Sequence, residues 1–388
     1  MELSMPLHRS PTRAEIDLDS IEHNLGEIRR LLGPAVKIMA VVKADGYGHG
    51  AVAVARAALG AGASSLAVAS LDEGLVLRRA GITAPVLLLG FTDPADASLL
   101  MEHRLTPTLF GLEAARRLSR SFASEGRCCP VHLKIDTGMG RLGVSPGEAL
   151  ELITAFSHLP GLRLEGLFTH LSSADEEEGR AFTGEQLRLF EAVLNAARER
   201  GLAPPLCHAA NSAAALLYPQ SRYNLVRIGI ALYGCYPSPW VRQQSTVKLK
   251  PAFSLKSEII FMKKVPAGTA LSYGRIYCTE RESIIATVPA GYADGYCRSL
   301  SNRGEALVCG RRVPVVGRIC MDQLLLDVSS VKSATLGDEV TLYGGQGPQR
   351  IAVEEMAGLL GTINYELLCN IGKRVPRRYL RRGQPVGE

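Results

Sequence analysis

The chain has 388 residues, of which 46% are hydrophobic and 21% charged, and this composition excludes a disordered or fibrous protein. At roughly 150 residues per domain, the length predicts two domains, or one large barrel with a smaller partner. The net charge of +6 comes from basic and acidic residues that are interspersed along the chain, and aromatic residues are only 6%. These values argue against a nucleic-acid surface and against a membrane surface.

Cysteine usage and the chain start indicate the compartment. Nine cysteines are scattered without any C-x-x-C pair, which is typical of reduced thiols and gives no signal for a metal site. Residues 1–12 lack the apolar segment of a signal peptide, and no apolar run reaches the roughly 18 residues of a transmembrane helix. The sequence therefore predicts a cytoplasmic protein.

Short apolar runs alternate with amphipathic stretches over the first part of the chain. Strands that alternate with helices form parallel sheets, and eight such units predict a (β/α)8 TIM barrel over residues 13–240. A doubly wound sheet is the alternative. The runs expected to be strands are Ile38–Val42, Leu66–Ala69, Val86–Leu89, Thr106–Leu109, Val131–Ile135, Leu164–Phe168, Leu206–Ala210 and Leu225–Ile230. Candidate helices are Gly50–Leu59, Leu71–Ala80, Gly111–Arg120 and Thr183–Arg200.

The pattern changes after Trp240. Residues 246–388 are expected to form a mostly antiparallel β domain, joined to the barrel by a linker over 235–245, and residues 1–12 could pack on it. One helix is expected near Val353–Leu360. The β-rich runs, cut by glycine turns, are Val247–Phe261, Ser283–Pro289, Ala306–Val308, Val313–Val316, Leu324–Val328 and Glu339–Leu342.

Lys43 follows an apolar strand and precedes the glycine-rich segment Ala44-Asp-Gly-Tyr-Gly-His-Gly50. A lysine at the carboxyl end of a barrel strand faces the active-site end of the barrel. A desolvated lysine there can lose its proton and form a Schiff base with an aldehyde. The alternative is a lysine that simply ends a buried strand.

Two segments expected at the ends of the last two barrel strands favour a phosphate site. Ser212 offers a hydroxyl, and Gly229 lets the backbone approach closely, in the two loops with which barrels often bind phosphate. Together with a Schiff-base lysine they indicate an aldehyde cofactor that carries a phosphate. Arg227 would donate a hydrogen bond to a pyridine nitrogen, with His208 to orient it, unless it forms an ordinary ion pair.

Two further residues follow the middle strands. Arg141 lies in Asp136-Thr-Gly-Met-Gly-Arg-Leu-Gly143 and could clamp a carboxylate, and His170 ends the sixth strand. The nearby Gly143-Val-Ser-Pro-Gly147 matches the G-x-S-x-G motif of hydrolases. It is rejected because Pro146 lacks the backbone N–H that such an oxyanion hole uses.

Taken together, Val41-Val-Lys-Ala-Asp-Gly-Tyr-Gly-His-Gly50, Ser272-Tyr-Gly-Arg275 and Cys320-Met-Asp-Gln323 resemble the alanine racemases, fold-type III pyridoxal phosphate enzymes. The resemblance runs from Arg13 to Tyr379, and Cys297 departs from it where a proline is expected. It implies a TIM barrel, a C-terminal β domain and a homodimer in which each active site joins one barrel to the partner's β domain.

The resemblance also implies the roles of individual residues. Lys43 would hold pyridoxal 5'-phosphate, Arg227 would meet the pyridine nitrogen, and His170 would pack near the ring. Arg141 and the Met321 backbone would bind the substrate carboxylate. Lys134 matches a lysine that is often carbamylated and supports the arginine. Phosphate contacts would come from Tyr47, Ser212, Gly229, Ile230 and Tyr365, with His208, Tyr292 and Asp322 in supporting places.

Racemisation needs one base on each face of the Cα atom. By resemblance, Lys43 serves the D-isomer and Tyr273 of the partner subunit serves the L-isomer of alanine. A phenol has a pKa near 10, so Tyr273 needs cationic neighbours, for which His208 and Arg227 are candidates. The implied product is D-alanine for peptidoglycan.

Three alternatives stay open. The first is another amino-acid racemase on the same scaffold, for serine or of broad specificity, although Tyr365 and Tyr292 would narrow the pocket toward alanine. The second is a fold-type III decarboxylase, whose cysteine acid and glycine-rich phosphate loop are not evident. The third is a non-catalytic cofactor carrier, which would lack the β domain and Tyr273.

Overall fold

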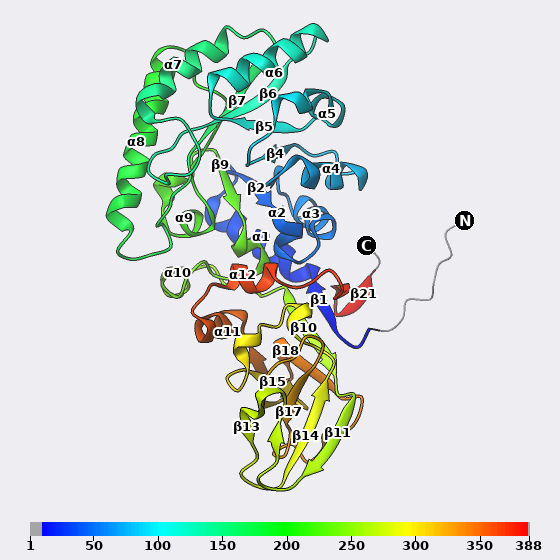
Figure 1. Ribbon diagram of the computed structural model, residues 1–388. Helices are drawn as coiled ribbons and strands as arrows, with labels where there is room; N and C mark the ends of the chain where they lie inside the picture. The colour runs from blue at the N-terminus through cyan, green and yellow to red at the C-terminus, as the bar shows by residue number, and fades with distance from the viewer. Residues whose placement is uncertain (1–9, 387–388) are drawn as a thin grey trace, which may run out of the picture. The chain divides into compact units, whose positions relative to one another are not determined.

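The computed structural model describes residues 10–386, which fall into two compact units (Figure 1). The barrel unit holds Ser20–Gly46 and Ala51–Lys250. The C-terminal unit holds the described residues up to Asp19, the segment Tyr47–Gly50 and the chain from Pro251 onward. The expectations for residues 1–9, no signal peptide and packing on the β domain, fall outside the described residues. Residues 235–245, the expected linker, hold helix α10 (Pro239–Gln244).

Eight parallel strands form the nearly closed barrel, in the order β8-β7-β6-β5-β4-β3-β2-β9. Between the two end strands, the Arg227 N–H donates to the Ala210 carbonyl at 3.0 Å. Every expected barrel strand overlaps an observed one, so the predicted fold is confirmed. The strands are β2 (Lys37–Val41), β3 (Ser65–Val68), β4 (Val86–Leu88), β5 (Thr106–Leu109), β6 (Cys129–Lys134), β7 (Leu162–Phe168), β8 (Leu206–His208) and β9 (Leu225–Ile228).

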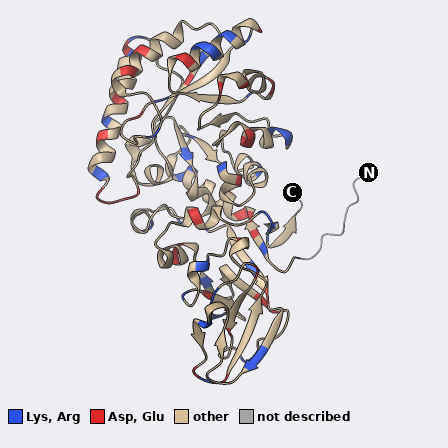
Figure 2. Ribbon diagram, in the orientation of Figure 1, with Lys and Arg blue, Asp and Glu red and all other residues tan. Residues whose placement is uncertain are grey.

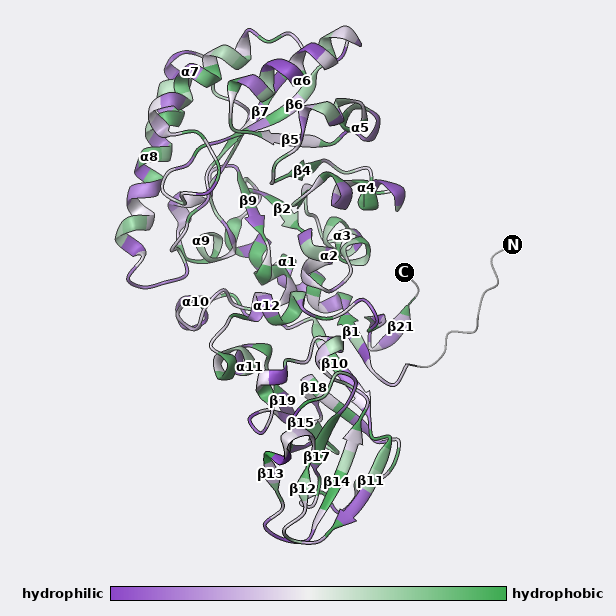
Figure 3. Cartoon of the chain, in the orientation of Figure 1, coloured by the Kyte–Doolittle hydropathy of each residue, from purple (hydrophilic) through white to green (hydrophobic). Residues whose placement is uncertain are grey.

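Most residues of the barrel strands are buried, which is why the strands appear in the sequence as mostly apolar runs. Helices α6 (Leu112–Ser124) and α8 (Arg180–Glu199) mix hydrophobic and hydrophilic residues and carry charges of both signs (Figures 2 and 3). Ser145, the serine of the rejected hydrolase motif, caps α7 in a capping box with Glu148.

The helices that accompany these strands are α1 (Leu18–Leu32), α2 (Lys43–Tyr47), α3 (Ala51–Gly60), α4 (Leu71–Arg79), α5 (Ala97–His103), α6 (Leu112–Ser124), α7 (Pro146–Ser157), α8 (Arg180–Glu199) and α9 (Ser212–Leu217). Short 3-10 turns are η1 (Pro94–Asp96), η2 (Pro219–Ser221) and η3 (Ile230–Tyr233). Among the described residues, no helix combines the length and the apolar character needed to cross a membrane.

The C-terminal unit is built on mostly antiparallel sheets. The largest has the order β16-β15-β18-β10-β1-β20-β21, with β19 beside β18, and a second has the order β11-β14-β17. One pairing, β1 with β20, is parallel. The Thr12 hydroxyl donates to the Pro289 carbonyl at 2.7 Å and ties the chain start to this unit.

The strands of this unit are β1 (Arg13–Asp17), β10 (Phe253–Glu258), β11 (Phe261–Val265), β12 (Ala270–Leu271), β13 (Tyr277–Cys278), β14 (Ser283–Val288), β15 (Glu305–Val308), β16 (Arg311–Pro314), β17 (Leu324–Asp327), β18 (Glu339–Gln346), β19 (Gln349–Ile351), β20 (Arg377–Arg381) and β21 (Gln384–Val386). Its helices are α11 (Val353–Leu360), α12 (Asn364–Cys369) and the 3-10 turns η4 (Tyr273–Arg275), η5 (Tyr292–Asp294) and η6 (Arg298–Leu300).

Two expectations for this unit need correction. The run 247–261, expected as one strand, is split: β10 begins at Phe253 and β11 begins at Phe261. Two helices follow the strands instead of one, because α12 comes after α11. The short breaks at Ile259–Ile260 and Gly361–Ile363 carry apolar residues, so hydrophobicity alone does not mark them.

Candidate active site

The carboxyl ends of the barrel strands carry most of the residues predicted for the barrel. Lys134 and His208 are the last residues of β6 and β8, and Arg227 lies in β9. Lys43 and His170 follow β2 and β7 by two residues each. Because the strands are parallel, these positions share one end of the barrel, where the active sites of such barrels lie.

A left-handed turn follows directly after Lys43. The φ angles of Ala44, Asp45 and Gly46 are 52°, 52° and 61°, and Tyr47 also has a φ of 52°. Left-handed geometry costs about 1–2 kcal/mol for each residue that carries a Cβ. The turn is held by polar contacts. The Asp45 carboxylate accepts from the Ala51 N–H at 2.9 Å, and the Glu73 carboxylate accepts from the Ala44 N–H at 2.7 Å. Such strain, compensated by neighbours, is typical of functional sites.

Arg227 is the central hydrogen-bond donor of the barrel interior and is 3% exposed. Its Nη1 donates to Nδ1 of His208 at 2.7 Å and to the His208 carbonyl at 3.2 Å. Its Nη2 lies 2.8 Å from the Thr169 carbonyl, 3.0 Å from the Ala209 carbonyl and 3.3 Å from Nδ1 of His170. Within the described part of the chain, its Nε–H makes no hydrogen bond, so one donor of the guanidinium is uncommitted.

The arginine fixes the tautomers of two buried histidines. A guanidinium can only donate, so Nδ1 of His208 accepts, and the proton of His208 sits on Nε2. That Nε2–H donates to Nδ1 of His132 at 2.9 Å. Burial, followed by the charge of Arg227, lowers the pKa of His208 well below its ordinary value and that of His132 to about 3. Gly166 makes room for this chain, because a Cβ there would lie 2.5 Å from the His132 ring.

Positive charge is concentrated at this end of the barrel. Burial, followed by the charges of Arg141 and Arg227, lowers the pKa of Lys134 to about 8. Burial also lowers the pKa of His170 well below its ordinary value, with contributions from Arg227, Lys134, Arg141 and Lys43. These contributions arise because the five side chains lie within electrostatic range of one another, and the lowered pKa keeps His170 neutral at pH 7.

The loop that carries Arg141 is organised by one carboxylate. Asp136 accepts hydrogen bonds from the backbone N–H groups of Gly138, Met139 and Gly140 at 2.9–3.1 Å. Burial would raise the pKa of Asp136, but these three donors outweigh it and lower the pKa. The side chain of Arg141 itself is exposed.

The loops after β8 and β9 meet at the Ser212 hydroxyl. It accepts from the Gly229 N–H at 3.0 Å and from the Ala231 N–H at 3.4 Å. Ile230 lies between these two donors and begins η3. The hydroxyl and the backbone groups predicted for a phosphate site are therefore adjacent.

The remaining predicted residues belong to the C-terminal unit. The rings of Tyr47 and Tyr365 lie 6.0 Å apart between centroids. Tyr273 begins η4, and its side chain is 70% exposed. Ser272 before it has a φ of 62°, a strained value for a residue with a Cβ, and its hydroxyl donates to the Arg318 carbonyl at 2.6 Å. The anchored turn presents the Tyr273 phenol to solvent within this chain.

Two turns of the C-terminal unit are joined by hydrogen bonds between their backbones. One carries Met321 and Asp322 between β16 and β17, and the other begins with Tyr292. The carbonyls of Cys320 and Met321 accept from the N–H groups of Tyr292 and Ala293, both at 3.1 Å. The predicted residues thus form one group in the barrel unit and a second group in the C-terminal unit.

Sequence reasoning missed three residues of these groups. His132 stands among apolar neighbours in Val131-His-Leu-Lys134 and matches no motif, so nothing distinguishes it from a core histidine. The sequence shows Gly166 only as a glycine that interrupts a strand. Arg374 contacts Asp322 and Asp294, which lie 52 and 80 positions earlier in the chain. Only the fold reveals such a partner.

Comparison with known proteins gives one consistent result. The family model described as "Alanine racemase, N-terminal domain" matches residues 16–237, and "Alanine racemase, C-terminal domain" matches residues 252–379. The alanine racemase of Desulforamulus reducens is 48% identical over 373 residues, covering 96% of this chain and 100% of the relative. That of Desulfovibrio desulfuricans is 46% identical over 370 residues, covering 95% of this chain and 98% of the relative.

Solved structures agree with these relatives. An alanine racemase of Clostridium difficile 630 has a TM-score of 0.92 and 40% identity, covering 98% of both chains. One from Bacillus anthracis, solved with bound L-Ala-P, has a TM-score of 0.91 and 42% identity, covering 99% of this chain and 98% of that chain. The similarity therefore spans both compact units.

Proposed function

The chain belongs to the alanine racemase family, a family of isomerases, and on this premise we propose a specific mechanism. The protein interconverts L-alanine and D-alanine with two bases and pyridoxal 5'-phosphate, and it supplies D-alanine for peptidoglycan. The observation that carries the proposal is the convergence of Lys43, His170, Arg227 and Lys134 at the carboxyl end of one barrel. The similarity of the chain to named alanine racemases over both units favours alanine over serine as the substrate.

The residues present fit pyridoxal phosphate. The uncommitted Nε–H of Arg227 supplies a donor for the ring nitrogen, and Lys43 supplies an amine for the aldehyde. The concentration of positive charge suits a phosphate dianion, for which Ser212, Gly229 and Ile230 provide hydroxyl and backbone groups. Tyr47 and Tyr365 complete the proposed phosphate contacts, and His170 lies against the ring.

When bound, pyridoxal phosphate would supply electron withdrawal that weakens the bond between Cα and hydrogen in alanine. Lys43 then accepts or returns the Cα proton on the face used by D-alanine. Tyr273 does so on the face used by L-alanine. Arg227 is protonated and donates to the ring nitrogen, which leaves that nitrogen without a proton. Electron withdrawal is thereby limited, and side reactions such as transamination are disfavoured.

The substrate carboxylate is held by Arg141 and by the Met321 backbone N–H. Lys134 supports Arg141 as a carbamate, and Tyr292 and Asp322 have supporting roles. A buried amine with a pKa of about 8 is about one tenth neutral at pH 7, and the neutral amine is the form that adds carbon dioxide. Carbamylation would replace a positive charge by a negative one beside Arg141 and so balance part of the local excess.

We propose that the enzyme is a homodimer with shared active sites. In each site, Lys43 and its barrel neighbours come from one subunit, and Tyr273 and Met321 come from the partner. This arrangement explains why a phenol assigned to catalysis is 70% exposed within a single chain.

A complementation experiment tests the two bases and their sharing together. Lys43→Ala removes the amine, and Tyr273→Phe removes only the phenolic proton carrier. Each variant alone is expected to lose racemisation by about 10²–10⁴-fold, and Tyr273→Phe is expected to keep the visible absorbance of bound cofactor. When the two variants are co-expressed, half of the dimers are mixed and each carries one intact site, so about a quarter of wild-type activity returns.

The controls separate the possible failures. Co-expression of two copies of Lys43→Ala should restore nothing. If the mixed dimers recover no racemase activity, the two subunits do not share their active sites. Near-normal rates of Tyr273→Phe in both directions would contradict the assignment of the second base.

A further inference from the structure

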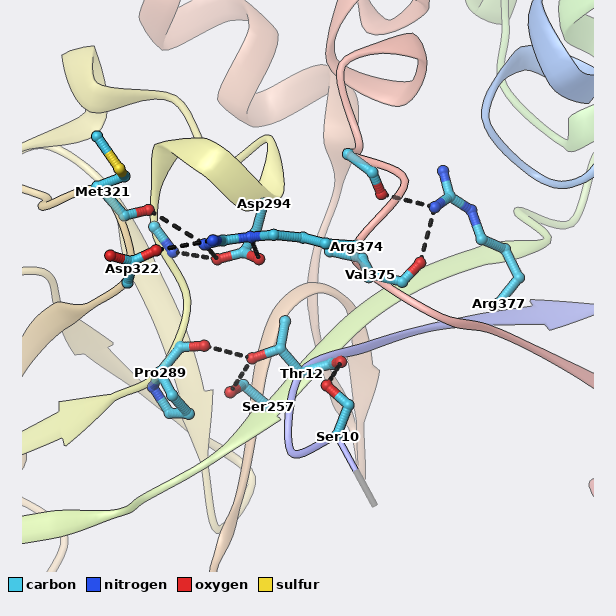
Figure 4. Close-up of polar contacts among 12 residues, drawn as sticks. Ser10, Thr12, Ser257, Pro289, Asp294, Met321, Asp322, Arg374, Val375 and Arg377 are labelled. Atoms are coloured by element: carbon cyan, nitrogen blue, oxygen red, sulfur yellow. Dashed lines mark hydrogen bonds and ion pairs between the residues drawn. The ribbon is translucent and has the colours of Figure 1, made fainter. Parts of the chain in front are cut away.

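Three chain segments meet beside the Met321–Asp322 turn of the C-terminal unit (Figure 4). They are the turn 291–295, the turn 320–323 and the segment 370–375 that leads into β20. The first two are joined through their backbones, and a Cβ at Gly291 would lie 2.3 Å from the carbonyl oxygens of Cys320 and Met321. The close approach therefore depends on glycine at this position.

Arg374 joins all three segments. Its Nε and Nη2 bind the two carboxylate oxygens of Asp294 at 2.7 and 3.0 Å, a bidentate pair in which the Asp294 side chain is 7% exposed. Its Nη1 binds Asp322 at 2.7 Å, and Nη2 also lies 3.4 Å from the Met321 carbonyl. The two carboxylates raise the pKa of Arg374 further above its ordinary value. Such fork-to-carboxylate pairs are strong and directional.

The peptide groups around Met321 have a fixed direction. The Cys320 carbonyl accepts from the Tyr292 N–H at 3.1 Å and so points toward the 291–295 turn. In a trans peptide the N–H lies opposite the carbonyl, and no peptide of the described chain is cis. The Met321 N–H consequently points away from that turn, and it makes no hydrogen bond within residues 10–386. The Met321 N–H is therefore available to a ligand, and the contacts of the turn hold it in a fixed direction.

Charge gives Arg374 a second effect. Without it, Asp294 and Asp322 would leave two uncompensated carboxylates beside the N–H assigned to a substrate carboxylate. Negative charge close to a binding site disfavours a bound anion. The positive charge of Arg374 offsets one of the two negative charges, and its contacts hold the 320–323 turn against the 291–295 turn.

We propose that Arg374 is a positioning residue for recognition of the substrate carboxylate. It acts through the Met321–Asp322 turn, by fixing the direction of the Met321 N–H and by neutralising Asp322. This inference rests on the proposed function, which assigns that N–H to the carboxylate of alanine.

The test uses the holoenzyme with acetate as a carboxylate probe. Arg374→Gln is expected to weaken inhibition by acetate about tenfold and to raise KM for alanine by a similar factor, with a smaller change in kcat. Arg374→Lys keeps the charge but loses the bidentate geometry and is expected to fall between wild type and Arg374→Gln. Asp322→Asn, added to Arg374→Gln, should recover part of the acetate affinity because it removes the uncompensated charge.

Arg312 offers a matched control. It also binds two carboxylates of the same unit, Glu305 at 2.7 Å and Glu355 at 2.5 Å, and among the described residues it forms no hydrogen bond or ion pair with the 320–323 turn. Arg312→Gln should lower thermal stability about as much as Arg374→Gln without changing acetate affinity. Equal effects of the two variants on acetate affinity would overturn the proposal.

Arg141→Lys distinguishes this proposal from the proposed function. If Arg141→Lys weakens acetate binding while Arg374→Gln does not, the positioning role of Arg374 is wrong and the carboxylate site stands. If neither variant weakens acetate binding, the assignment of the carboxylate site itself is wrong.

Discussion

Arg227 is a buried cation surrounded by neutral acceptors. Carbonyl oxygens and imidazole nitrogens accept its hydrogen bonds, and its Cζ lies 5.2 Å from the ring centroid of Phe168. Within the described residues, no carboxylate lies within 4 Å of it. Burial lowers the pKa of Arg227 to about 9, which still leaves the guanidinium protonated at pH 7. The guanidinium therefore remains a charged donor for the pyridine nitrogen that we assign to it.

The histidine chain behind Arg227 predicts a pH dependence of stability. His132 has a pKa of about 3 in the folded protein and an ordinary value of 6.5 when unfolded, so the unfolded state binds more protons between these values. Stability then rises with pH across this window and falls as the solution is acidified below pH 6.5. At pH 5 the loss from His132 amounts to about 2 kcal/mol. His132→Asn should lose less stability on acidification than wild type, as measured by urea unfolding.

An isosteric pair separates this effect from the positioning of Arg227. His132→Asn retains an acceptor for the His208 Nε2–H, whereas His132→Leu has a similar shape and none. We expect ¹⁵N NMR to report the Nε2–H tautomer of His208 in wild type and in the asparagine variant. An Nδ1–H tautomer in wild type would contradict the network.

At the scale of elements, the loop after β2 shows how the fold stores strain near Lys43. Ala44 and Asp45 adopt left-handed geometry although both carry a Cβ, and the hydrogen bonds of the turn hold them there. A flexible segment would relax to right-handed geometry, so this turn is rigid by construction. The position of Lys43 after β2 follows from that rigidity.

Replacement of Ala44 by glycine tests the strain. Ala44→Gly should stabilise the protein by roughly 0.5–1 kcal/mol, because relief of the left-handed Cβ exceeds the entropy cost of glycine. The control, Ala192→Gly, lies at an exposed position inside helix α8 and should destabilise by about 1 kcal/mol. Thermal unfolding midpoints that shift in opposite directions support the account, and a fall in both midpoints contradicts it.

The sequence predicts the barrel better than the C-terminal unit for a physical reason. Buried parallel strands are mostly apolar, so each of the eight appears as a distinct run. Strand β20 reads Arg-Arg-Tyr-Leu-Arg, and its charges hide it even though it pairs with β1. The strand β1, the hairpin of β12 with β13 and the helix α12 are short, and their stability comes from tertiary packing.

At the scale of the whole molecule, the residues predicted for the site fall into two groups, one in each compact unit. Lys43, Arg227 and their neighbours could be predicted because each follows an apolar strand or lies in a recognisable motif. The contacts of Arg374 and His132 could not, because they depend on which distant segments the fold brings together. The residues assigned to substrate recognition therefore include some that the sequence predicts and some that only the fold reveals.

The central claim is that this protein racemises alanine, and chiral chromatography tests it most directly. Purified protein with pyridoxal phosphate is incubated with L-alanine and, in parallel, with L-serine. The account predicts rapid approach to equal amounts of D- and L-alanine, because the free energies of the two enantiomers are equal, with serine much slower. Faster turnover of serine would contradict the assigned substrate. Absence of any D-alanine from protein that carries bound cofactor would contradict the racemase function itself.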